Sequence, residues 1–454
     1  MPLSQAPRRT RKIYVFAVSF ACGFALGTGA VGGAYRQSRI YLGQAAPNIA
    51  GIAGVLLDDP RTTSRGSGAA TIALRETAGK SGVRTSARGN VLVFFPEGSI
   101  PRLKEFGRKS EVFVDGTFNE NSGGAMNGDF TFRAKGVHIN KSAPPVEQLR
   151  TKARLAVIDA FSREAAGGSR SNAFGGLALA LLLGIKDNLD SHLAKQYRDA
   201  GCSYILALSG MHLAIISALI AFLLKKPLGK KGAAAVGAVF IILYVFIVGA
   251  APSLMRAAIM YLFGTAAILG GFAVRPSLVL QAAFLLQIVF DPASGSSISF
   301  LLSYLALAGI LSIGEAAGAL MRGLLPPKIA SPLSAGIGAF LATQAITVWF
   351  FGSLRLIGII AGLIMVPLTT VFMIGSIAYL ALSFVFPPLT PLLSVPLNII
   401  YKALEITAGG AAKFPALNTP PNVPVMLFSV MLPFAFLAAH HCIIKKKYGI
   451  MEIS

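Results

Sequence analysis

Residues Tyr204–Leu224 have the sequence YILALSGMHLAIISALIAFLL. These twenty-one residues are enough for one helix to cross a lipid bilayer, and their strongly polar part is confined to Ser209, Gly210 and His212. A hydroxyl and an imidazole are costly in hydrocarbon, so we expect this group to face a protein interior, a partner or a water-filled cavity. The structural alternative is a packing notch that holds a hydrogen-bonded histidine.

The whole chain has the composition of a polytopic membrane protein. Of its 454 residues, 54% are hydrophobic and only 13% are charged. The net charge of +22 exceeds what orientation signals in cytoplasmic loops require, which favours an anionic partner. Cys22, Cys202 and Cys442 lie in or beside apolar segments, too far apart for a C-x-x-C motif, so we expect buried apolar thiols.

Apolar segments predict a polytopic α-helical membrane protein with about ten spans. Basic residues in the first twelve positions, in the loop Lys225–Lys231 and in the tail Lys445–Gly449 predict that both termini are cytoplasmic. Besides Tyr204–Leu224, the predicted spans are an uncleaved first span, Ile13–Ala34, and then Gly232–Ala250, Pro252–Phe272, Ser277–Phe290, Ser296–Ile313, Leu333–Phe351, Leu356–Phe384, Leu392–Gly409 and Val423–Ile444. Within Leu392–Gly409, Lys402 and Glu405 leave open a helix that lies at the membrane interface.

Between the first span and about Asn172 the composition becomes that of a soluble domain. This stretch holds 20 Lys and Arg residues against 12 Asp and Glu residues, a net charge of +8. Because it follows one span, we expect it outside the cytoplasm, and its short strands predict a small closed barrel of the OB type. The predicted strands are Ile49–Leu57, Ala69–Leu74, Asn90–Phe95, Ser110–Phe118 and Asp129–Ile139.

Barrels of this kind bind single-stranded nucleic acid by combining a basic groove with aromatic platforms. The candidate platforms are Phe94, Phe95, Phe113, Phe130 and Phe132. The candidate phosphate partners are Arg102, Lys104, Arg108, Lys109, Arg133 and Lys135. The alternative is that the phenylalanines face the barrel core and the basic residues form a solvated surface.

Residues between this domain and the central span connect the two. Val146–Arg170 has the mixed charge of a soluble helix, and Phe174–Gly184 is apolar but too short to span, which predicts a half-span or re-entrant segment. In Ile185–Gly201, apolar residues recur every four positions at Leu189, Leu193 and Tyr197, which predicts an amphipathic interfacial helix.

Polar side chains within other spans suggest a polar conduit, and Pro367 suggests a broken helix of the kind found in pores and transporters. Arg256 lies near a helix end, where extension to the lipid headgroups is the alternative to lining a path. The polar residues are Ser253, Arg256, Gln281, Gln287, Ser299, Ser303, Tyr304 and Gln344, and the candidate channel-lining residues are Ser209, Gly210, His212, Ser253, Arg256, Gln281 and Ser303.

The order and spacing of four segments resemble the membrane domain of the ComEC family of competence proteins, the inner-membrane channels of bacterial DNA uptake. The resemblance covers about Ala173–Leu382, and the S-G-x-H element at Ser209–His212 is its most specific part. The segments are LLLGIKDNLDSHLAKQYRDAGCSYILALSGMHLAII, APSLMRAAIMYL, DPASGSSISFLLSYLALAGI and FFGSLRLIGIIAGLIMVPLT.

The resemblance implies that the protein translocates single-stranded DNA into the cytoplasm during natural transformation. The basic domain would receive the strand, and the spans around His212 and Arg256 would form its path. The implied organisation is a basic segment and first span (1–34), an extracytoplasmic OB-like domain (35–145), connecting and interfacial helices (146–201), a channel domain (202–444) and a cytoplasmic tail (445–454).

Two departures from the family pattern qualify this expectation. Many members carry a C-terminal metallo-β-lactamase-like domain, whereas this sequence has five histidines and no H-x-H-x-D-H run. It also has Gly362 where the family commonly has asparagine, so a polar role of the side chain at that position is in doubt. Without that metal motif or a Walker A motif, we expect no catalytic residue, metal or cofactor in this chain. The expected partners are single-stranded DNA, a periplasmic or surface DNA receptor, a separate nuclease, a cytoplasmic motor or helicase, the lipid bilayer and a second copy of the chain.

Two other classes of function remain open. One is a small-molecule or ion transporter whose outer domain is regulatory. The other is a membrane enzyme that acts on an anionic lipid or polymer, which would need an acidic residue or histidine at the outer interface. The available carboxylates are Asp187, Asp190, Asp199 and Asp291, which we interpret first as helix-capping and helix-end residues.

Overall fold

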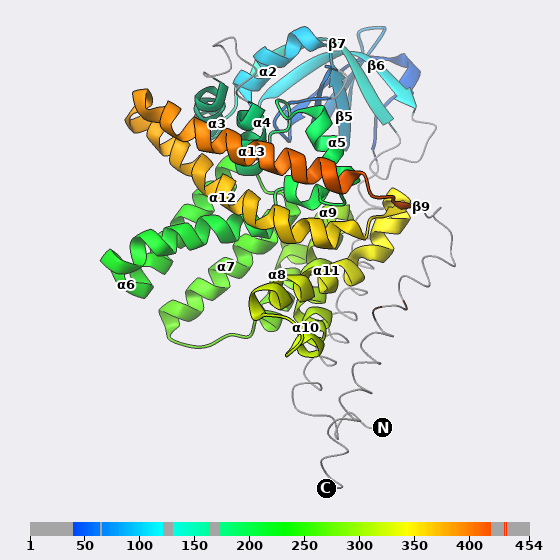
Figure 1. The fold of residues 1–454 in the computed structure, drawn as a ribbon. Coiled ribbons are helices and arrows are strands. Elements are labelled where there is room, and N and C mark those ends of the chain that lie inside the picture. Colours follow the sequence, from blue (N-terminus) through cyan, green and yellow to red (C-terminus); the bar gives the residue numbers. More distant parts are fainter. Residues whose placement is uncertain are drawn as a thin grey trace.

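A computed structural model describes residues 40–63, 66–120, 130–162 and 173–418, together with residues 431 and 433. The predicted first span, last span and basic tail, with Cys22 and Cys442, lie outside the described residues. A mixed sheet domain lies above a body of helices in Figure 1. The long apolar helices and the separate sheet domain agree with the predicted polytopic architecture.

The sheet domain is a closed circuit of five long strands. β1 (Ile49–Leu56) pairs with both β3 (Gly68–Gly79) and β6 (Glu111–Glu120), so the sheet has no free edge there. β3 pairs with β5 (Asn90–Phe95), and β7 (Phe130–Lys141) joins β5 in parallel and β6 antiparallel. Two short strands, β2 (Arg61–Thr62) and β4 (Arg84–Ser86), extend β3.

Alternation of apolar and polar residues builds the core of this domain. Ile52, Ile72, Val93 and Val114 point inward and are fully buried, while their strand neighbours face outward. A short helix, α2 (Ile100–Phe106), follows β5 and places the buried side chain of Leu103 against this core. The five predicted strands therefore lie close to the observed ones.

Three helices connect the sheet domain to the long helices. They are α3 (Pro145–Ser162), α4 (Ala173–Leu183) and α5 (Ser191–Asp199). The described side chains of α4 are all buried, as expected of an apolar half-span within protein. The predicted interfacial helix is shorter than expected, and Leu193 and Tyr197 are buried against protein, because α5 packs along α13.

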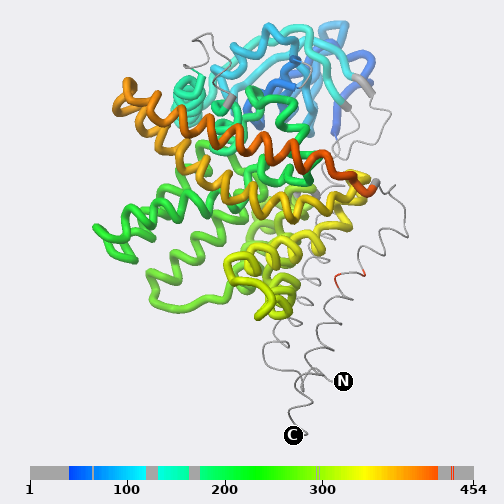
Figure 2. The backbone as a smooth tube through the Cα atoms, in the orientation of Figure 1, coloured from blue at the N-terminus to red at the C-terminus, as the bar shows by residue number. Residues whose placement is uncertain are grey.

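Within the described residues, six helical segments are long and apolar enough to cross a membrane. They are α6 (Gly210–Val248), α7 (Pro252–Gly270), α9 (Ile298–Gly309) continued through η8 (Ile310–Gly314) into α10 (Glu315–Met321), α11 (Pro327–Phe351), α12 (Ile357–Val385), and η9 (Pro387–Leu389) with α13 (Thr390–Ala412). Residues Pro276–Phe290 form α8, which is shorter. The tubes of α12 and α13 lie side by side in Figure 2.

Helix α6 is folded back on itself. Gly229 has φ 67° and ψ 177°, outside the helical region, and Pro227 precedes it. A Cβ atom on Gly237 would lie 3.8 Å from Ile220, although a straight helix would separate these residues by about 25 Å. The segment predicted as one span, Tyr204–Leu224, overlaps a 3-10 turn at Ser203–Leu206, and its α-helix begins only at Gly210. The second arm of α6 corresponds to the predicted span Gly232–Ala250.

Sequence determines where several helices begin and end. Pro252, Pro276 and Pro327 each stand in the first turn, where no intrahelical N–H donor is needed. Gly271 and Gly352 follow α7 and α11 in the left-handed conformation, which glycine adopts without steric cost.

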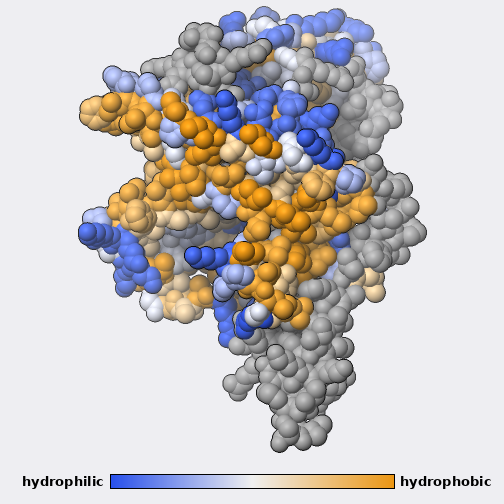
Figure 3. Space-filling model, in the orientation of Figure 1, coloured by the Kyte–Doolittle hydropathy of each residue, from blue (hydrophilic) through white to orange (hydrophobic). Residues whose placement is uncertain are grey.

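The outer faces of the long helices are apolar. Figure 3 shows hydrophobic side chains over α6, α12 and α13, with hydrophilic residues over the sheet domain and at the tip of α6. Exposed apolar side chains on these helices include Phe222, Val239, Ile360, Ile399 and Ile406. A surface of this kind suits contact with lipid, so the chain has the architecture of a multi-pass membrane protein.

Candidate functional site

Ser209 and His212 are hydrogen-bonded to each other at the start of α6. The backbone N–H of Ser209 donates to Nδ1 of His212 at 3.1 Å, and the Ser209 hydroxyl lies 3.0 Å from the same nitrogen. Because a backbone N–H can only donate, Nδ1 carries no proton and a neutral imidazole has its proton on Nε2. Nε2 is buried without a hydrogen-bond partner; the Ile205 carbonyl lies nearby but outside hydrogen-bond geometry.

Arg256 of α7 lies against the same helix start. Its Nη1 donates to the backbone oxygen of Ser303 at 2.7 Å, and its Cζ lies 5.9 Å from the centre of the Tyr304 ring. A Cβ atom on Gly210 would lie 2.8 Å from Nη2, so glycine leaves room for the guanidinium. Only 8% of Arg256 is exposed, so its head group lies within protein and does not extend to lipid headgroups.

Further polar contacts join four helices around this arginine. The Ser253 hydroxyl donates to the backbone oxygen of Leu208, which fixes the start of α7 to the residues before α6. The amide nitrogen of Gln287 donates to the backbone oxygen of Pro252 at 3.1 Å, and the Tyr304 hydroxyl donates to the amide oxygen of Gln287 at 3.0 Å. We call the residues Ser209, Gly210, His212, Ser253, Arg256, Gln287, Ser303 and Tyr304 the polar cluster.

The polar cluster contains six of the seven candidate channel-lining residues. Ser303 contributes through its backbone oxygen, and the seventh candidate, Gln281, is half-buried almost two turns of α8 before Gln287. Gln287 and Tyr304 were visible in the sequence as polar groups within spans. Their membership of the cluster depends on contacts between α7, α8 and α9, which the sequence alone does not give. Which of these residues line a path stays a prediction.

A second polar region, the domain junction, joins the sheet domain to the helices. Arg150 of α3 donates to both carboxylate oxygens of Asp59, at 2.8 and 2.7 Å, and to the backbone oxygen of Phe246 near the end of α6. Arg154 also donates to the last backbone oxygens of α6 and lies 3.5 Å from Asp59. The sheet domain is therefore fixed above the end of α6 that lies opposite its lysine-rich tip.

Three of the candidate phosphate partners are engaged at this junction. Lys104 lies 2.5 Å from Asp187, and Arg108 and Lys109 both pair with Glu147, at 2.8 and 2.9 Å. The side chain of Glu147 is only 3% exposed and its pair with Arg108 is shielded from water, whereas Lys109 is exposed. A phosphate contact by these cations would require them to exchange their carboxylate partners, and their role in DNA binding stays a prediction.

The carboxylates of the junction are held in their charged form. Burial alone raises the pKa of Asp59, but the hydrogen bond from Arg150 and the nearby Arg154 lower that pKa by more. Burial likewise raises the pKa of Glu147, and the hydrogen bonds from Arg108 and Lys109 bring it below its usual value.

The remaining sheet-domain candidates lie elsewhere. Phe94 is half-buried and is paired in register with Arg133 on the outer wall of the barrel, where Lys135 is also exposed. Arg102 is exposed on α2, and the side chain of Phe130 lies outside the described residues. The platform prediction is wrong for Phe95 and Phe132, which are buried in the core because they occupy inward-facing strand positions. Phe113 is half-buried beneath the guanidinium of Arg84.

The carboxylates considered for an enzyme have structural partners. Asp190 caps α5 by accepting the backbone N–H of His192, and Asp291 accepts the backbone N–H of Ser294. Asp199 pairs with Arg355 at 2.9 Å, and Asp187 pairs with Lys104. The capping interpretation is confirmed for Asp190 and Asp291. Cys202 is fully buried, as predicted for an apolar thiol.

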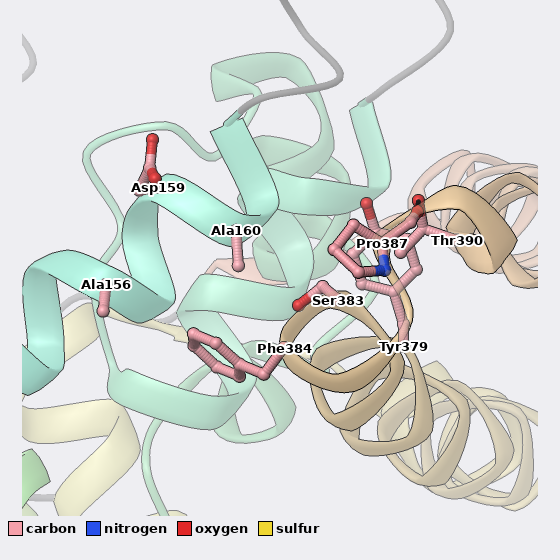
Figure 4. A pocket seen from close by; sticks show the side chains of 8 residues that line it. All are labelled: Ala156, Asp159, Ala160, Tyr379, Ser383, Phe384, Pro387 and Thr390. Carbon is pink, nitrogen blue, oxygen red and sulfur yellow. Dashed lines mark hydrogen bonds between the residues drawn. The ribbon is translucent and has the colours of Figure 1, made fainter.

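One cavity lies apart from both polar regions. It has a volume of about 140 Å³ and lies between α3 and the turn that joins α12 to α13. Figure 4 shows Ala160 of α3 facing Ser383 and Phe384 of α12 across it. None of the candidate site residues lines this cavity, so the sequence predictions do not bear on it.

Comparisons with known proteins match the helical region to one protein family. The family model described as "Competence protein" matches residues 181–441, which is more than half of the chain. The chain is 29% identical to ComE operon protein 3 of Bacillus subtilis (strain 168) over 137 residues, which cover 28% of this chain and 17% of that relative. It is 23% identical to an uncharacterized protein of Aquifex aeolicus (strain VF5) over 341 residues, or 74% of this chain and 78% of that relative. The match thus spans less than a fifth of the Bacillus protein.

Proposed function

This chain belongs to the competence protein family, as its resemblance to ComEC proteins predicted, and we propose that it is a membrane channel that carries single-stranded DNA into the cytoplasm during natural transformation. The observation that carries the proposal is the polar cluster. A histidine and an arginine are buried together at the ends of apolar helices, where hydrocarbon would penalise both unless a polar path or ligand made use of them.

The proposed channel has ten spans. Counting the two arms of α6 separately and adding α8 to the other long helices gives eight spans within the described part of the chain. The apolar segments Ile13–Ala34 and Val423–Ile444 supply the other two. Each arm of α6 has about nineteen residues, close to what a bilayer core of about 30 Å requires.

The proposed orientation follows from lysine placement. Lys225, Lys226, Lys230 and Lys231 are gathered at the tip of α6, and the sheet domain is attached at the opposite end of its arms. Lysine-rich short loops remain cytoplasmic, so the tip faces the cytoplasm and the sheet domain faces the outside of the inner membrane. Ten spans then leave both termini in the cytoplasm.

We infer that the sheet domain is an OB-type barrel that receives the strand. In support, its long strands follow the cyclic order β1-β3-β5-β7-β6, with β5 and β7 parallel and one helix between β5 and β6. Such barrels hold single strands on an aromatic and basic wall, and Phe94, Arg133 and Lys135 supply those side chains here.

Other proteins would complete the uptake pathway. A strand that carries one negative charge per nucleotide must be delivered by a receptor, made single-stranded by a nuclease and pulled by a motor or helicase. We assign none of these activities to this chain and propose that separate partners supply them. A second copy of the chain is a further proposed partner.

Transformation of a deletion strain tests the proposal. With the gene deleted, we expect DNA to bind the cell surface normally and transformation to fail, and the wild-type gene should restore it. Normal transformation without the gene would contradict the proposal. Loss of surface binding as well would assign the protein to an earlier step than translocation.

A further inference from the structure

Arg256 is a buried cation whose charge is not balanced by a neighbouring carboxylate. Its Nη1 has the Ser303 carbonyl as acceptor, but its Nε is buried with no hydrogen-bond partner. Among the residues that the structure describes, no acidic side chain pairs with it, and the Tyr304 ring is its aromatic neighbour. Buried charges in proteins are normally paired, so an unpaired guanidinium among apolar helices indicates that a counter-charge comes from elsewhere.

The start of α6 adds a second positive feature at the same place. Ser209 caps the backbone N–H of His212, whereas the N–H groups of Gly210 and Met211 before it have no intrahelical acceptor, and the helix dipole concentrates positive charge there. Gly210, the first residue of α6, lies so close to Nη2 that an added Cβ atom would come within 2.8 Å of it. The guanidinium and the positive end of the helix repel each other unless an anion lies beside both.

The neighbouring side chains offer donors rather than negative charge. His212 is neutral while Nδ1 accepts the Ser209 N–H, and its buried Nε2 proton has only the Ile205 backbone beside it, outside hydrogen-bond geometry. Ser253, Gln287 and Tyr304 are uncharged. Ser253 and Gln287 donate hydrogen bonds to backbone oxygens, and Tyr304 donates to Gln287. The Nε of Arg256 and the Nε2 of His212 are thus two buried donors at a helix start, a combination that suits a phosphate oxygen.

We propose that Arg256 and the N-terminus of α6 form a phosphate-binding site that holds one phosphodiester group of the passing strand. The inference rests on the proposed function and specifies which part of the DNA the polar cluster recognises. The phosphate oxygens accept hydrogen bonds from the guanidinium and from the first backbone N–H groups of α6, so the site recognises the backbone and is independent of base sequence. Gly210 is required because a Cβ atom there would displace the guanidinium, whose Nη2 would lie only 2.8 Å away.

The salt dependence of DNA binding tests this site. The full-length protein in lipid nanodiscs is titrated with a single-stranded oligonucleotide at several salt concentrations. Arg256→Gln and Gly210→Ala should each weaken binding about tenfold. Each should also reduce the slope of log K against log salt by about 0.7, the value for one phosphate contact with a single strand.

Matched variants separate this site from general damage. Arg256→Lys keeps a cation and should keep the salt slope while losing affinity. Gly264→Ala is the control for Gly210→Ala, because an added Cβ atom at Gly264, also within a helix, has open space around it. A wild-type protein that binds no oligonucleotide would refute the proposed function. Wild-type binding with an unchanged salt slope in Arg256→Gln and Gly210→Ala would overturn the phosphate site and leave the proposed function standing.

Discussion

Arg150 binds Asp59 through two hydrogen bonds of 2.8 and 2.7 Å, and the same guanidinium donates to the backbone of Phe246. The side chain of Arg150 is 1% exposed, so water competes little for these contacts. One arginine thereby joins the sheet domain, the connecting helix α3 and the end of α6. The position of the sheet domain over the helices depends on this contact.

Replacing Asp59 with Asn should destabilise the protein by about 3 kcal/mol, because it leaves the buried Arg150 without its counter-charge. Thermal unfolding of the purified protein measures the change. Glu76→Gln is the control, since Glu76 makes an exposed pair with Arg84 at 3.9 Å and should change stability by less than about 1 kcal/mol. Equal effects of the two substitutions would show that Arg150 does not depend on Asp59.

The domain junction should be stable at neutral pH and weaken in acid. Asp59 and Glu147 have folded-state pKa values below their usual 3.8 and 4.5, so both pairs contribute their full stability above those usual values. That contribution is lost as the pH falls through the lower folded values. Unfolding temperature against pH should be flat from pH 8 to about pH 5 and then decline. Glu147→Gln should reduce the acid decline, and a decline that begins near pH 7 would point to other groups.

The basic residues of the sheet domain should separate into two functional groups. Arg133→Gln with Lys135→Gln should weaken oligonucleotide binding and its salt dependence without lowering the unfolding temperature, because both side chains are exposed on the outer wall. Lys104→Gln should lower the unfolding temperature, because it removes the pair with Asp187. Both properties are measured on the full chain in nanodiscs. If the outer-wall variant binds normally, the strand contacts another face.

Gly229 should be required for the turn in α6. Its φ of 67° with ψ of 177° lies in a region that is almost exclusive to glycine, so Gly229→Ala should cost about 1 to 3 kcal/mol. No atom lies within 4 Å of the added Cβ position, so the cost reflects backbone strain alone. Thermal unfolding against Gly264→Ala provides the comparison. A neutral result at Gly229 would mean that α6 can continue without the turn.

The sequence predicted local structure well because periodicity and turn chemistry are local. The predicted strand Asn90–Phe95 matches β5, and the predicted spans that start at Pro252 and Ser277 begin within one residue of α7 and α8. The turn of α6 was also predicted as a loop rich in lysine. The start of α6 was not, because Ser203–Leu206 form a 3-10 turn and Leu208 accepts a hydrogen bond from the distant Ser253.

Contacts between distant segments could not be predicted in this way. Lys104 and Arg108 were candidate phosphate ligands because the sequence gives their charge, but their carboxylate partners lie 83 and 39 residues away. Likewise, the contacts of Tyr304 with Gln287 and with Arg256 arise from helix packing. The resemblance to a known family suggested what the spans do, and only the structure shows which groups each polar side chain contacts.

The most direct test of the central claim is the amount of labelled DNA that reaches the cytoplasm. A deletion strain is complemented with the wild-type gene or with His212→Ala, and membrane insertion of both proteins is verified. We predict that wild type restores cytoplasmic DNA and that His212→Ala, inserted at normal levels, does not, while DNA still binds the cell surface. Normal uptake by His212→Ala would contradict a channel that has the polar cluster at its working centre.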